Sequence, residues 1–238
     1  MATMTMSPQI AVPQRSFRDL VVLFAKEAKY EVVKNMRVPM YAASTVIFPV
    51  MFYVLFGFAV SIAMERGQGW LQVKRASPMP LAAYFTAKLV SAMAFSGTIA
   101  ITLLVVGYTL AHVRLAPMQI LTLIGTLMLA AITFGAMGLT LGYIAKPNSA
   151  PAVVNLVYLP MSFCSGLWIP FFLLPKLVKE VARLLPPFHV SQLALRAVGM
   201  GRDAYSIATH IEALIGFTLL FLGIAVVLYR RDEGQLYG

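Results

Sequence analysis

The sequence predicts an all-α integral membrane protein with five to six transmembrane helices, and two observations support this fold class. Of its 238 residues, 60% are hydrophobic and only 12% are charged, whereas soluble domains carry about 25% charged residues. The apolar residues also gather into runs of about 20 residues or more, the length that a helix needs to cross a bilayer. We therefore expect one transmembrane domain over residues 1–238.

Five apolar runs are long enough to span a membrane, and short polar breaks separate several of them. No charged residue occurs in residues 115–145 or in residues 147–175. The breaks at residues 111–116 and 146–149 are so short that we expect the flanking helices to form antiparallel hairpins. The expected spans are residues 40–64, 84–110, 117–145, 150–174 and 209–229.

The N-terminal segment, residues 1–38, is predicted to contain a helix that lies in the membrane interface. Apolar residues recur there at helical spacing, and basic residues fall mostly on the opposite side. A basic amphipathic helix directly before a span is typical of an interfacial helix; the alternative is a soluble helix that packs on a partner. The apolar positions are Leu20, Val21, Phe24, Ala28 and Val32, and the basic ones are Lys26, Lys29 and Lys34.

Residues 174–200 are predicted to form two short amphipathic helices that dip into the membrane without crossing it. Pro186 and Pro187 separate two apolar stripes. Proline lacks an N–H group and restricts its neighbour, so it ends the first helix and starts the second. Neither helix reaches the length of a span.

Small residues repeat at intervals of three or four positions in the third expected span. They are Ala131, Gly135, Gly138 and Gly142. Such spacing lets helix backbones approach closely in a membrane. The pattern is compatible with packing inside the chain or with a seam between two copies of it.

Several functional classes find little support in the sequence. The net charge of +10 comes from short basic patches between apolar runs, which suits cytoplasmic loops better than nucleic-acid binding. The three histidines have no ligand spacing, and the HExxH, CxxC, GxSxG and GxxxxGK[ST] motifs are missing. We expect neither an enzyme nor a metal or cofactor site in this chain. The span centres hold no ionisable residue, which disfavours an ion-coupled carrier.

The order of these features is similar to that of the membrane subunit of ABC-2-type ABC transporters. In that family a charged stretch is the cytoplasmic coupling loop, and residues 65–83 (ERGQGWLQVKRASPMPLAA) resemble it. The family also has a re-entrant helix pair on the outer side, which residues 174–200 resemble. The coupling positions are Glu65, Arg66, Gly67, Trp70, Leu71, Lys74, Arg75 and Pro78, and the outer positions are Gly166, Pro170, Pro175, Pro186, Pro187 and Arg196.

The resemblance implies a permease subunit of an exporter in the bacterial inner membrane. It implies a second copy of the permease and a separate ATPase subunit, which binds ATP and Mg²⁺. The apolar walls favour hydrophobic or amphipathic cargo, such as drugs or lipid-linked molecules. In the coupling loop, Trp70 and Leu71 would anchor the ATPase contact, with Arg66, Lys74 and Arg75 as charges at its rim. The alternative is an ATP-independent channel or carrier.

The family has two spans before the coupling loop, whereas this chain has one apolar run there, residues 40–64. If that run crosses once and the loop is inside, 7 lysines and arginines are inside and 12 outside, against the positive-inside rule. If the run bends back, with Pro49 and Gly57 as candidate bending points, the N-terminal lysines and arginines move inside, and the counts become 13 inside and 6 outside. Reversing the orientation of the five-span topology gives 12 lysines and arginines inside and 7 outside, but it places the coupling loop outside. We therefore expect a bent or re-entrant element with both termini cytoplasmic; loss of a piece of the first hairpin, with impaired function, is the alternative.

Overall fold

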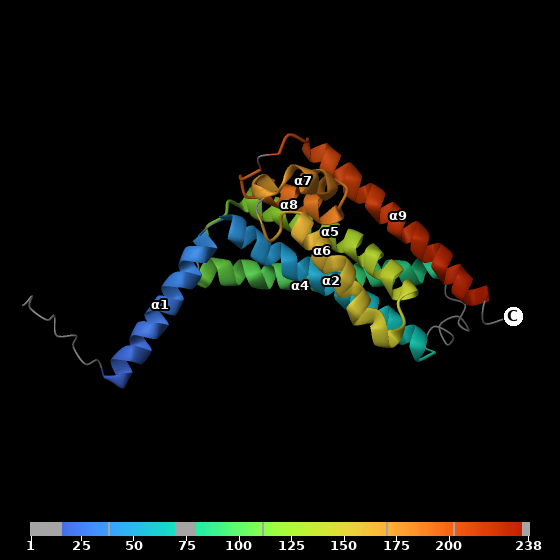
Figure 1. Ribbon diagram of the computed structural model, residues 1–238, viewed down its shortest axis with the longest axis horizontal. Coiled ribbons are helices and arrows are strands. Elements are labelled where there is room, and N and C mark those ends of the chain that lie inside the picture. The colour runs from blue at the N-terminus through green and yellow to red at the C-terminus, as the bar shows by residue number, and fades with distance from the viewer. Residues whose placement is uncertain are drawn as a thin grey trace, which may run out of the picture.

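The computed structural model is a bundle of helices (Figure 1). It describes residues 16–37, 39–69, 80–110, 112–169, 171–201 and 203–234, and no strand occurs among them. The all-α prediction is therefore confirmed for this part of the chain. The helices are α1 (Phe17–Arg37), α2 (Pro39–Gly67), α4 (Leu81–Leu110), α5 (Pro117–Ile144), α6 (Ala150–Cys164), α7 (Lys176–Arg183), α8 (Pro186–Ala197) and α9 (Ile207–Gly234), with short 3₁₀ turns η1 (Pro147–Ser149) and η2 (Phe171–Leu173).

Four helices in the described part are long and apolar enough to cross a membrane. They are Thr45–Gly67, Leu81–Thr109, Pro117–Ile144 and Ile207–Asp232. The fourth predicted span is wrong as a single helix, because α6 ends at Cys164 after 15 residues. At 1.5 Å per residue α6 reaches about 22 Å, short of a hydrocarbon core of about 30 Å.

A turn at Gly166 explains why α6 stops early. Gly166 has a φ of +85°, a backbone conformation that residues with a side chain rarely adopt. The chain then continues through η2 into α7 and α8. As the prolines predicted, α7 ends at Arg183 and α8 begins at Pro186.

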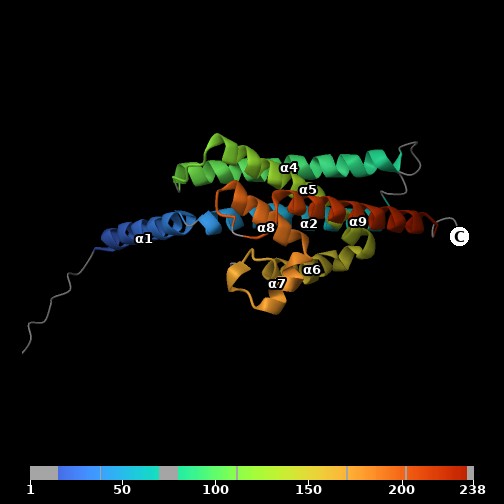
Figure 2. The same cartoon turned by 90° about the horizontal axis from the view of Figure 1, so that it is seen from above.

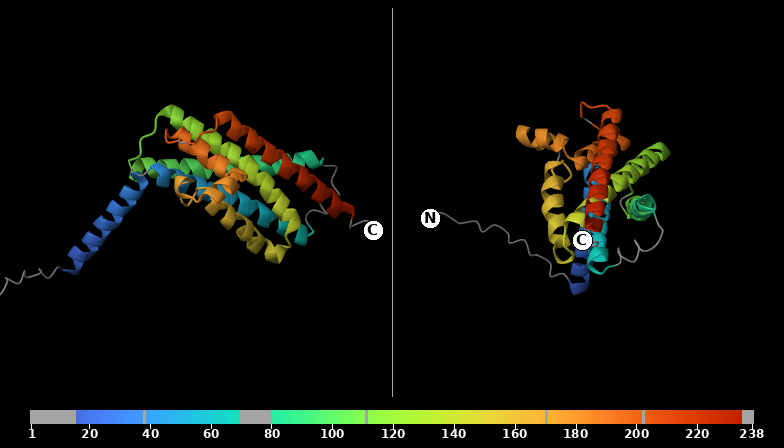
Figure 3. Two further views of the ribbon diagram at one scale, coloured as in Figure 1. Left: turned by 45° about the horizontal axis from the view of Figure 1, so that its top comes forward. Right: turned by 90° about the vertical axis from the view of Figure 1, so that its right-hand side faces the viewer.

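The two ends of the bundle are distinct. We call one the Gly67 end: there α2, α5 and α9 finish, and α4 and α6 begin. The opposite end, which we call the α8 end, contains α7, α8 and the α4–α5 connection (Figure 3). The short breaks at residues 111–116 and 146–149 do join antiparallel neighbours, as predicted.

Helix α5 is the centre of the packing. It contacts α2, α4, α8 and α9, and Figure 2 shows α4 on one side of the α2–α5 pair and α6 and α7 on the other. Half of the apolar window of α5 is buried, against 17% for α4 and 11% for α9. The outer faces of α4 and α9 are therefore the surfaces left for lipid or another chain.

The small residues of α5 let α2 and α4 approach its backbone. A Cβ atom placed on Gly138 would lie 3.1 Å from the carbonyl oxygen of Leu55, and one on Gly142 would lie 2.9 Å from that of Ala59. Gly135 faces α4 in the same way, since its Cβ would lie 3.3 Å from the Cβ of Ala92.

These contacts decide between the two explanations of the small-residue pattern. The approaches to Gly135, Gly138 and Gly142 are occupied by α2 and α4, and Ala131 is buried at 1% exposure. The structure therefore supports packing within the chain, and a seam between two copies must use other residues.

The expectation that residues 40–64 form a re-entrant element, which returns the chain to the side where it began, is wrong. Helix α2 is continuous over 29 residues and contains Pro49 without ending there. Its start lies at the α8 end and its finish at the Gly67 end. Proline is tolerated inside membrane helices where neighbouring groups satisfy the backbone that it frees.

Helix α1 leaves the bundle at the start of α2 and projects away from it (Figure 1). Pro39 opens α2, as proline commonly does at a first helical position. The apolar side chains of Phe17, Val21 and Phe24 are all exposed. The predicted helix is confirmed, while its place in the membrane interface stays a prediction.

A single crossing by α2 also separates α1 from the end of α9. The two lie at opposite ends of the bundle (Figure 3). This arrangement disagrees with the expectation that both termini lie on the cytoplasmic side. The charge argument favoured a return of the chain, but helix continuity through Pro49 prevents it.

The glycine contacts predict a difference between two substitutions on α5. Gly142→Ala should lower the free energy of unfolding by about 1–3 kcal/mol, because overpacking forces α2 away. Gly125→Ala is the matched control, since a Cβ there meets nothing within 4 Å, and it should be neutral or stabilising by up to about 1 kcal/mol. Thermal unfolding in detergent measures both, and equal effects would contradict the packing.

The crossing of α2 predicts the outcome of a two-reporter experiment. A reporter that is active only in the cytoplasm is fused at residue 1 in one strain and at residue 238 in another. One fusion should be active and the other silent, because α2 places α1 and the end of α9 at opposite ends. Activity from both fusions would restore the re-entrant alternative.

Candidate functional site

Polar side chains gather in two clusters, one at each end of the bundle. The Gly67-end cluster joins the finish of α2, the start of α4, and the ends of α5 and α9. The α8-end cluster joins α7, α8, the following loop and the start of α9. The Gly67-end cluster consists of Glu65, Arg66, Tyr84, Lys88, Tyr143 and Asp232. The α8-end cluster consists of Arg183, His189, Arg196, Asp203, Tyr205 and His210.

Arg66, in the last turn of α2, caps the end of α5. Its Nη1 donates to the carbonyl oxygens of Tyr143 at 2.7 Å, Gly142 at 3.2 Å and Ala145 at 3.4 Å. Its Nη2 forms an ion pair with Asp232 of α9 at 2.9 Å. The last carbonyls of a helix lack partners within it and carry partial negative charge, which a cation offsets. One guanidinium thus holds the ends of three helices.

Glu65, the neighbouring residue, binds the start of α4. It forms an ion pair with Lys88 and accepts a hydrogen bond from the Tyr84 hydroxyl at 3.1 Å. A third hydrogen bond, at 3.2 Å, comes from Ser61 on α2 itself. Since α2 and α4 flank the coupling-loop candidate, Glu65 ties together the two helices that enter and leave it.

The remaining coupling-loop candidates are placed as follows. Gly67 ends α2 against the ring of Pro147 of η1, which leaves no room for a Cβ atom on Gly67. Glu65 and Arg66 bind other helices of the chain and are half-buried, and their part in an ATPase contact stays a prediction. The other residues that we predicted to contact the ATPase lie outside the described residues. They are Trp70, Leu71, Lys74, Arg75 and Pro78.

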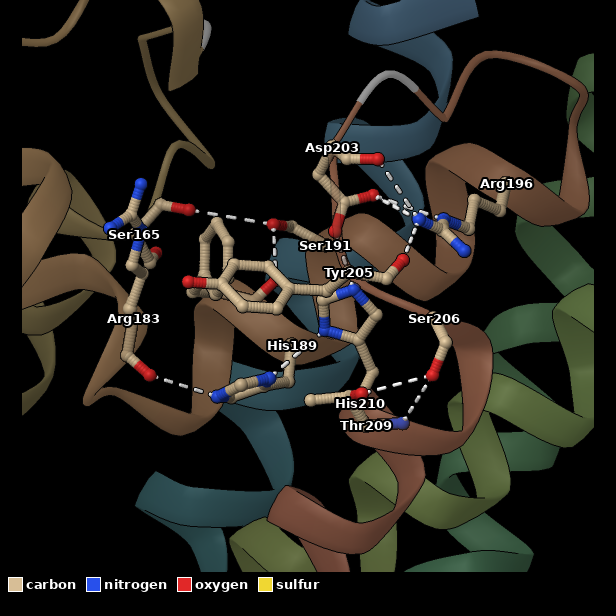
Figure 4. Close-up of polar contacts among 11 residues, drawn as sticks. Ser165, Arg183, His189, Ser191, Arg196, Asp203, Tyr205, Ser206, Thr209 and His210 are labelled. Carbon is tan, nitrogen blue, oxygen red and sulfur yellow. Dashed lines mark hydrogen bonds and ion pairs between the residues drawn. The ribbon is translucent and has the colours of Figure 1, made fainter.

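At the α8 end, Arg196 and Asp203 close the loop between α8 and α9 (Figure 4). The Nε and Nη2 atoms of Arg196 donate to Oδ1 of Asp203 at 3.0 and 2.7 Å. Nη2 also donates to the carbonyl oxygens of Asp203 and Tyr205. Arg196 therefore holds the loop that leads into α9, and its role in the outer element that the resemblance implies stays a prediction.

Two histidines extend this network into the buried interior (Figure 4). His210 on α9 is fully buried, and its Nε2 lies 2.7 Å from Oδ2 of Asp203. Its Nδ1 lies 3.0 Å from Nδ1 of His189 on α8. The Nε2 of His189 in turn lies 3.0 Å from the carbonyl oxygen of Arg183 on α7.

Burial and hydrogen bonds shift the pKa values of two groups in this cluster. Burial lowers the pKa of His189, an effect that the hydrogen bond to the Arg183 carbonyl only partly opposes. Burial alone would raise the pKa of Asp203, but hydrogen bonds from Arg196 and His210 outweigh it and lower that pKa. His189 is therefore held neutral and Asp203 ionised.

The other outer-element candidates have structural places near this cluster. Pro186 and Pro187 are buried in the first turn of α8, and Pro175 directly precedes α7. A Cβ on Gly166 would lie 3.2 Å from the Cβ of Phe171, so the turn there is tight. Pro170 lies outside the described residues.

Sequence reasoning missed the histidine pair. His189 and His210 are 21 residues apart, so no short motif joins them and the sequence alone shows only scattered histidines. A usable signal was the pairing of Arg196, in the last turn of α8, with Asp203 in the loop that follows, at a spacing that can close an ion pair. His189 also falls on the helix that begins at Pro186, which is buried over most of its length.

Apolar helices of membrane-spanning length, with the described charged groups gathered near the two bundle ends, define a polytopic membrane protein. Comparison with known proteins gives its family. Residues 21–227 match the family described as ABC-2 family transporter protein, so the chain belongs to the ABC-2 transporter family. It is also similar to "Putative transport permease YvfS" of Bacillus subtilis (strain 168), with 23% identity over 193 residues that cover 81% of this chain and 78% of the relative.

The position of Arg66 predicts a loss of stability on its replacement. Arg66→Gln should lower the free energy of unfolding by about 2 kcal/mol, because hydrogen bonds from a charged donor to three carbonyls and a carboxylate are lost. Lys34→Gln removes the same charge from an exposed pair with Glu31 and should cost at most about 1 kcal/mol. Chemical denaturation in detergent compares them, and equal costs would contradict the capping role.

The shifted pKa of His189 predicts destabilisation by acid. Unfolded His189 takes up a proton near pH 6.5 and the folded residue only at lower pH, so stability is present above that pH and falls below it. The slope reaches at most about 1.4 kcal/mol per pH unit. His189→Gln should flatten this dependence and His112→Asn, in an exposed loop, should keep it; an unchanged slope in His189→Gln would refute the assignment.

Proposed function

We propose that this chain is the membrane subunit of an ATP-driven exporter, paired with a separate ATPase subunit that binds ATP and Mg²⁺. Its family is that of ABC-2 transporters. The observation that carries the proposal is the Gly67-end cluster, which ties both flanks of the coupling-loop candidate to the rest of the bundle. A push on that loop would reach four helices at once.

The geometry of the cluster suits such a role. Glu65 joins α2 to α4 through Lys88 and Tyr84, while Arg66 joins α2 to α5 and α9. These pairs are only partly exposed, which weakens screening by salt relative to a surface pair. The helix ends therefore move as a unit rather than singly.

A groove beside this cluster offers a place for the ATPase to contact. It has a volume of about 630 Å³ and lies between the finish of α2 and η1. Its walls include Gln68, Lys146 and Asn148, so it combines polar groups and a positive charge. We propose that the ATPase subunit binds here and to residues 65–83.

The cargo in this proposal is hydrophobic or amphipathic, such as a drug or a lipid-linked molecule. A second groove, of about 450 Å³, lies between α5, α8 and α9 at the α8 end. Leu129, Leu193 and Ile211 form apolar walls, and Thr122 and Thr126 add hydroxyls. Such a mixture fits a molecule with a long apolar part and a small polar one.

The proposed location is the bacterial inner membrane, with the Gly67 end and the C-terminal end of α9 in the cytoplasm. In this orientation α7 and α8 face outward. The exposed apolar side chains of Leu177 in α7 and of Leu184 directly after it would contact lipid. A second copy of the chain would complete the transporter through surfaces other than the small residues of α5.

The test begins with the complex itself. The tagged chain is purified from its own membranes, a co-purifying subunit with the GxxxxGK[ST] motif is identified, and the two are reconstituted in liposomes. We expect ATPase activity that depends on this chain. Cargo movement by the chain alone, without ATP, would instead support the ATP-independent channel or carrier.

Paired substitutions then separate coupling from folding. Asp232→Asn weakens the Arg66 ion pair at the Gly67 end, and Asp203→Asn weakens the Arg196 pair at the α8 end. Asp232→Asn should keep the complex but lower chain-dependent ATPase activity by at least about fivefold, the lower range of typical coupling. Asp203→Asn should preserve that activity. Equal effects would remove the Gly67-end cluster from the proposal.

A further inference from the structure

The hydrogen bonds of the two buried histidines fix where their protons must be. A neutral imidazole has one N–H donor and one acceptor nitrogen. The Nε2 of His189 faces the carbonyl oxygen of Arg183 at 3.0 Å. A carbonyl only accepts, so this nitrogen must carry a proton. A neutral His189 then presents an unprotonated Nδ1.

The same reasoning applies to His210. Its Nε2 lies 2.7 Å from Oδ2 of Asp203, and a carboxylate only accepts. A neutral His210 therefore also presents an unprotonated Nδ1. The two Nδ1 atoms are 3.0 Å apart, a hydrogen-bond distance, but two lone pairs cannot bond. One more proton is required between them.

We infer that His189 and His210 together form a buried site that binds one proton beyond those of two neutral imidazoles. With it, three of the four ring nitrogens are protonated. His210 is then an imidazolium that donates from Nε2 to Asp203 and from Nδ1 to His189. Every polar atom of both rings has a partner, as buried groups require.

The position of the proton follows from the surroundings of Asp203. An alternative places it on Asp203, which would then donate to Nε2 of His210. Arg196, however, donates twice to the other oxygen of Asp203, and this favours the carboxylate. The proton therefore belongs to His210, next to the carboxylate charge.

The groups around the pair allow this charge state. From α7, the Arg183 carbonyl faces His189, while the Arg183 guanidinium lies over the ring of Tyr205 and binds Glu180. From α9, Phe217 lies against His189. Helix α5, which packs on both α8 and α9, has no charged residue in its sequence. Among the residues that the structure describes, the charged groups that face the pair are thus Asp203 directly and Arg196 through it.

The bound proton joins α8 to α9. Without it, the Nδ1 atoms of His189 and His210 repel each other and the bond between the helices is lost. With a second extra proton, two imidazolium rings would face each other. Proton occupancy therefore sets how firmly α8 is held on the bundle, independently of any ATPase partner.

Nitrogen-15 NMR counts these protons directly. The full-length His112→Asn protein, labelled only at histidine, contains just the four ring nitrogens of the pair. Asparagine suits position 112, where φ is +54°. At pH 7.5 we expect three protonated ring nitrogens and one unprotonated. Two protonated and two unprotonated nitrogens would overturn the inference.

Hydrogen–deuterium exchange tests the link between the helices. The pH is raised until the NMR spectrum shows loss of the third proton. Amide exchange in α8, corrected for its intrinsic pH dependence, should then rise by about fivefold to tenfold relative to α5, as the loss of one net hydrogen bond predicts. Unchanged exchange in α8 would overturn the role of the proton in holding it.

Discussion

The close approach of α5 to α2 is the constraint on which the rest of the fold depends. In a bilayer, lipid tails are as apolar as leucine, so helices associate through van der Waals contact and hydrogen bonds rather than through the hydrophobic effect. Gly138 and Gly142 allow that contact by bringing the α5 backbone against Leu55 and Ala59. Once α2 and α5 are joined, α4, α8 and α9 pack around α5, and the large aromatic side chains fill the remaining space.

The same approach positions the charged groups. Because α2 and α5 run parallel within van der Waals distance and both finish at the Gly67 end, Arg66 comes within 2.7 Å of the last carbonyls of α5. Buried cations need such partners, since desolvation without compensation costs several kcal/mol. The helix ends therefore combine two functions: they satisfy the backbone of α5 and they gather the charges at the flank of the coupling-loop candidate.

Much of this fold could be predicted from the sequence, and the reasons are specific. The charge-free run from residue 115 to residue 145 determined α5, and the proline pair at Pro186 determined the break between α7 and α8. Hydropathy could not show that α6 ends at Cys164, because the residues after Gly166 are equally apolar and only backbone geometry ends the helix. The histidine pair was equally hidden, since His189 and His210 meet through the packing of α8 on α9.

Helix α9 connects the two polar clusters. At the α8 end, His210 binds the histidine partner and Asp203; at the Gly67 end, Asp232 binds Arg66. Between them, Thr133 and Thr140 of α5 make hydrogen bonds to α9 of 2.9 and 2.8 Å. Such bonds are individually worth about 0.6 kcal/mol in membranes, so they guide α9 along α5 more than they lock it. Helix α9 is thus largely exposed along its length and is held by charged groups at each end. Through α9, a displacement at the Gly67 end would reach α8.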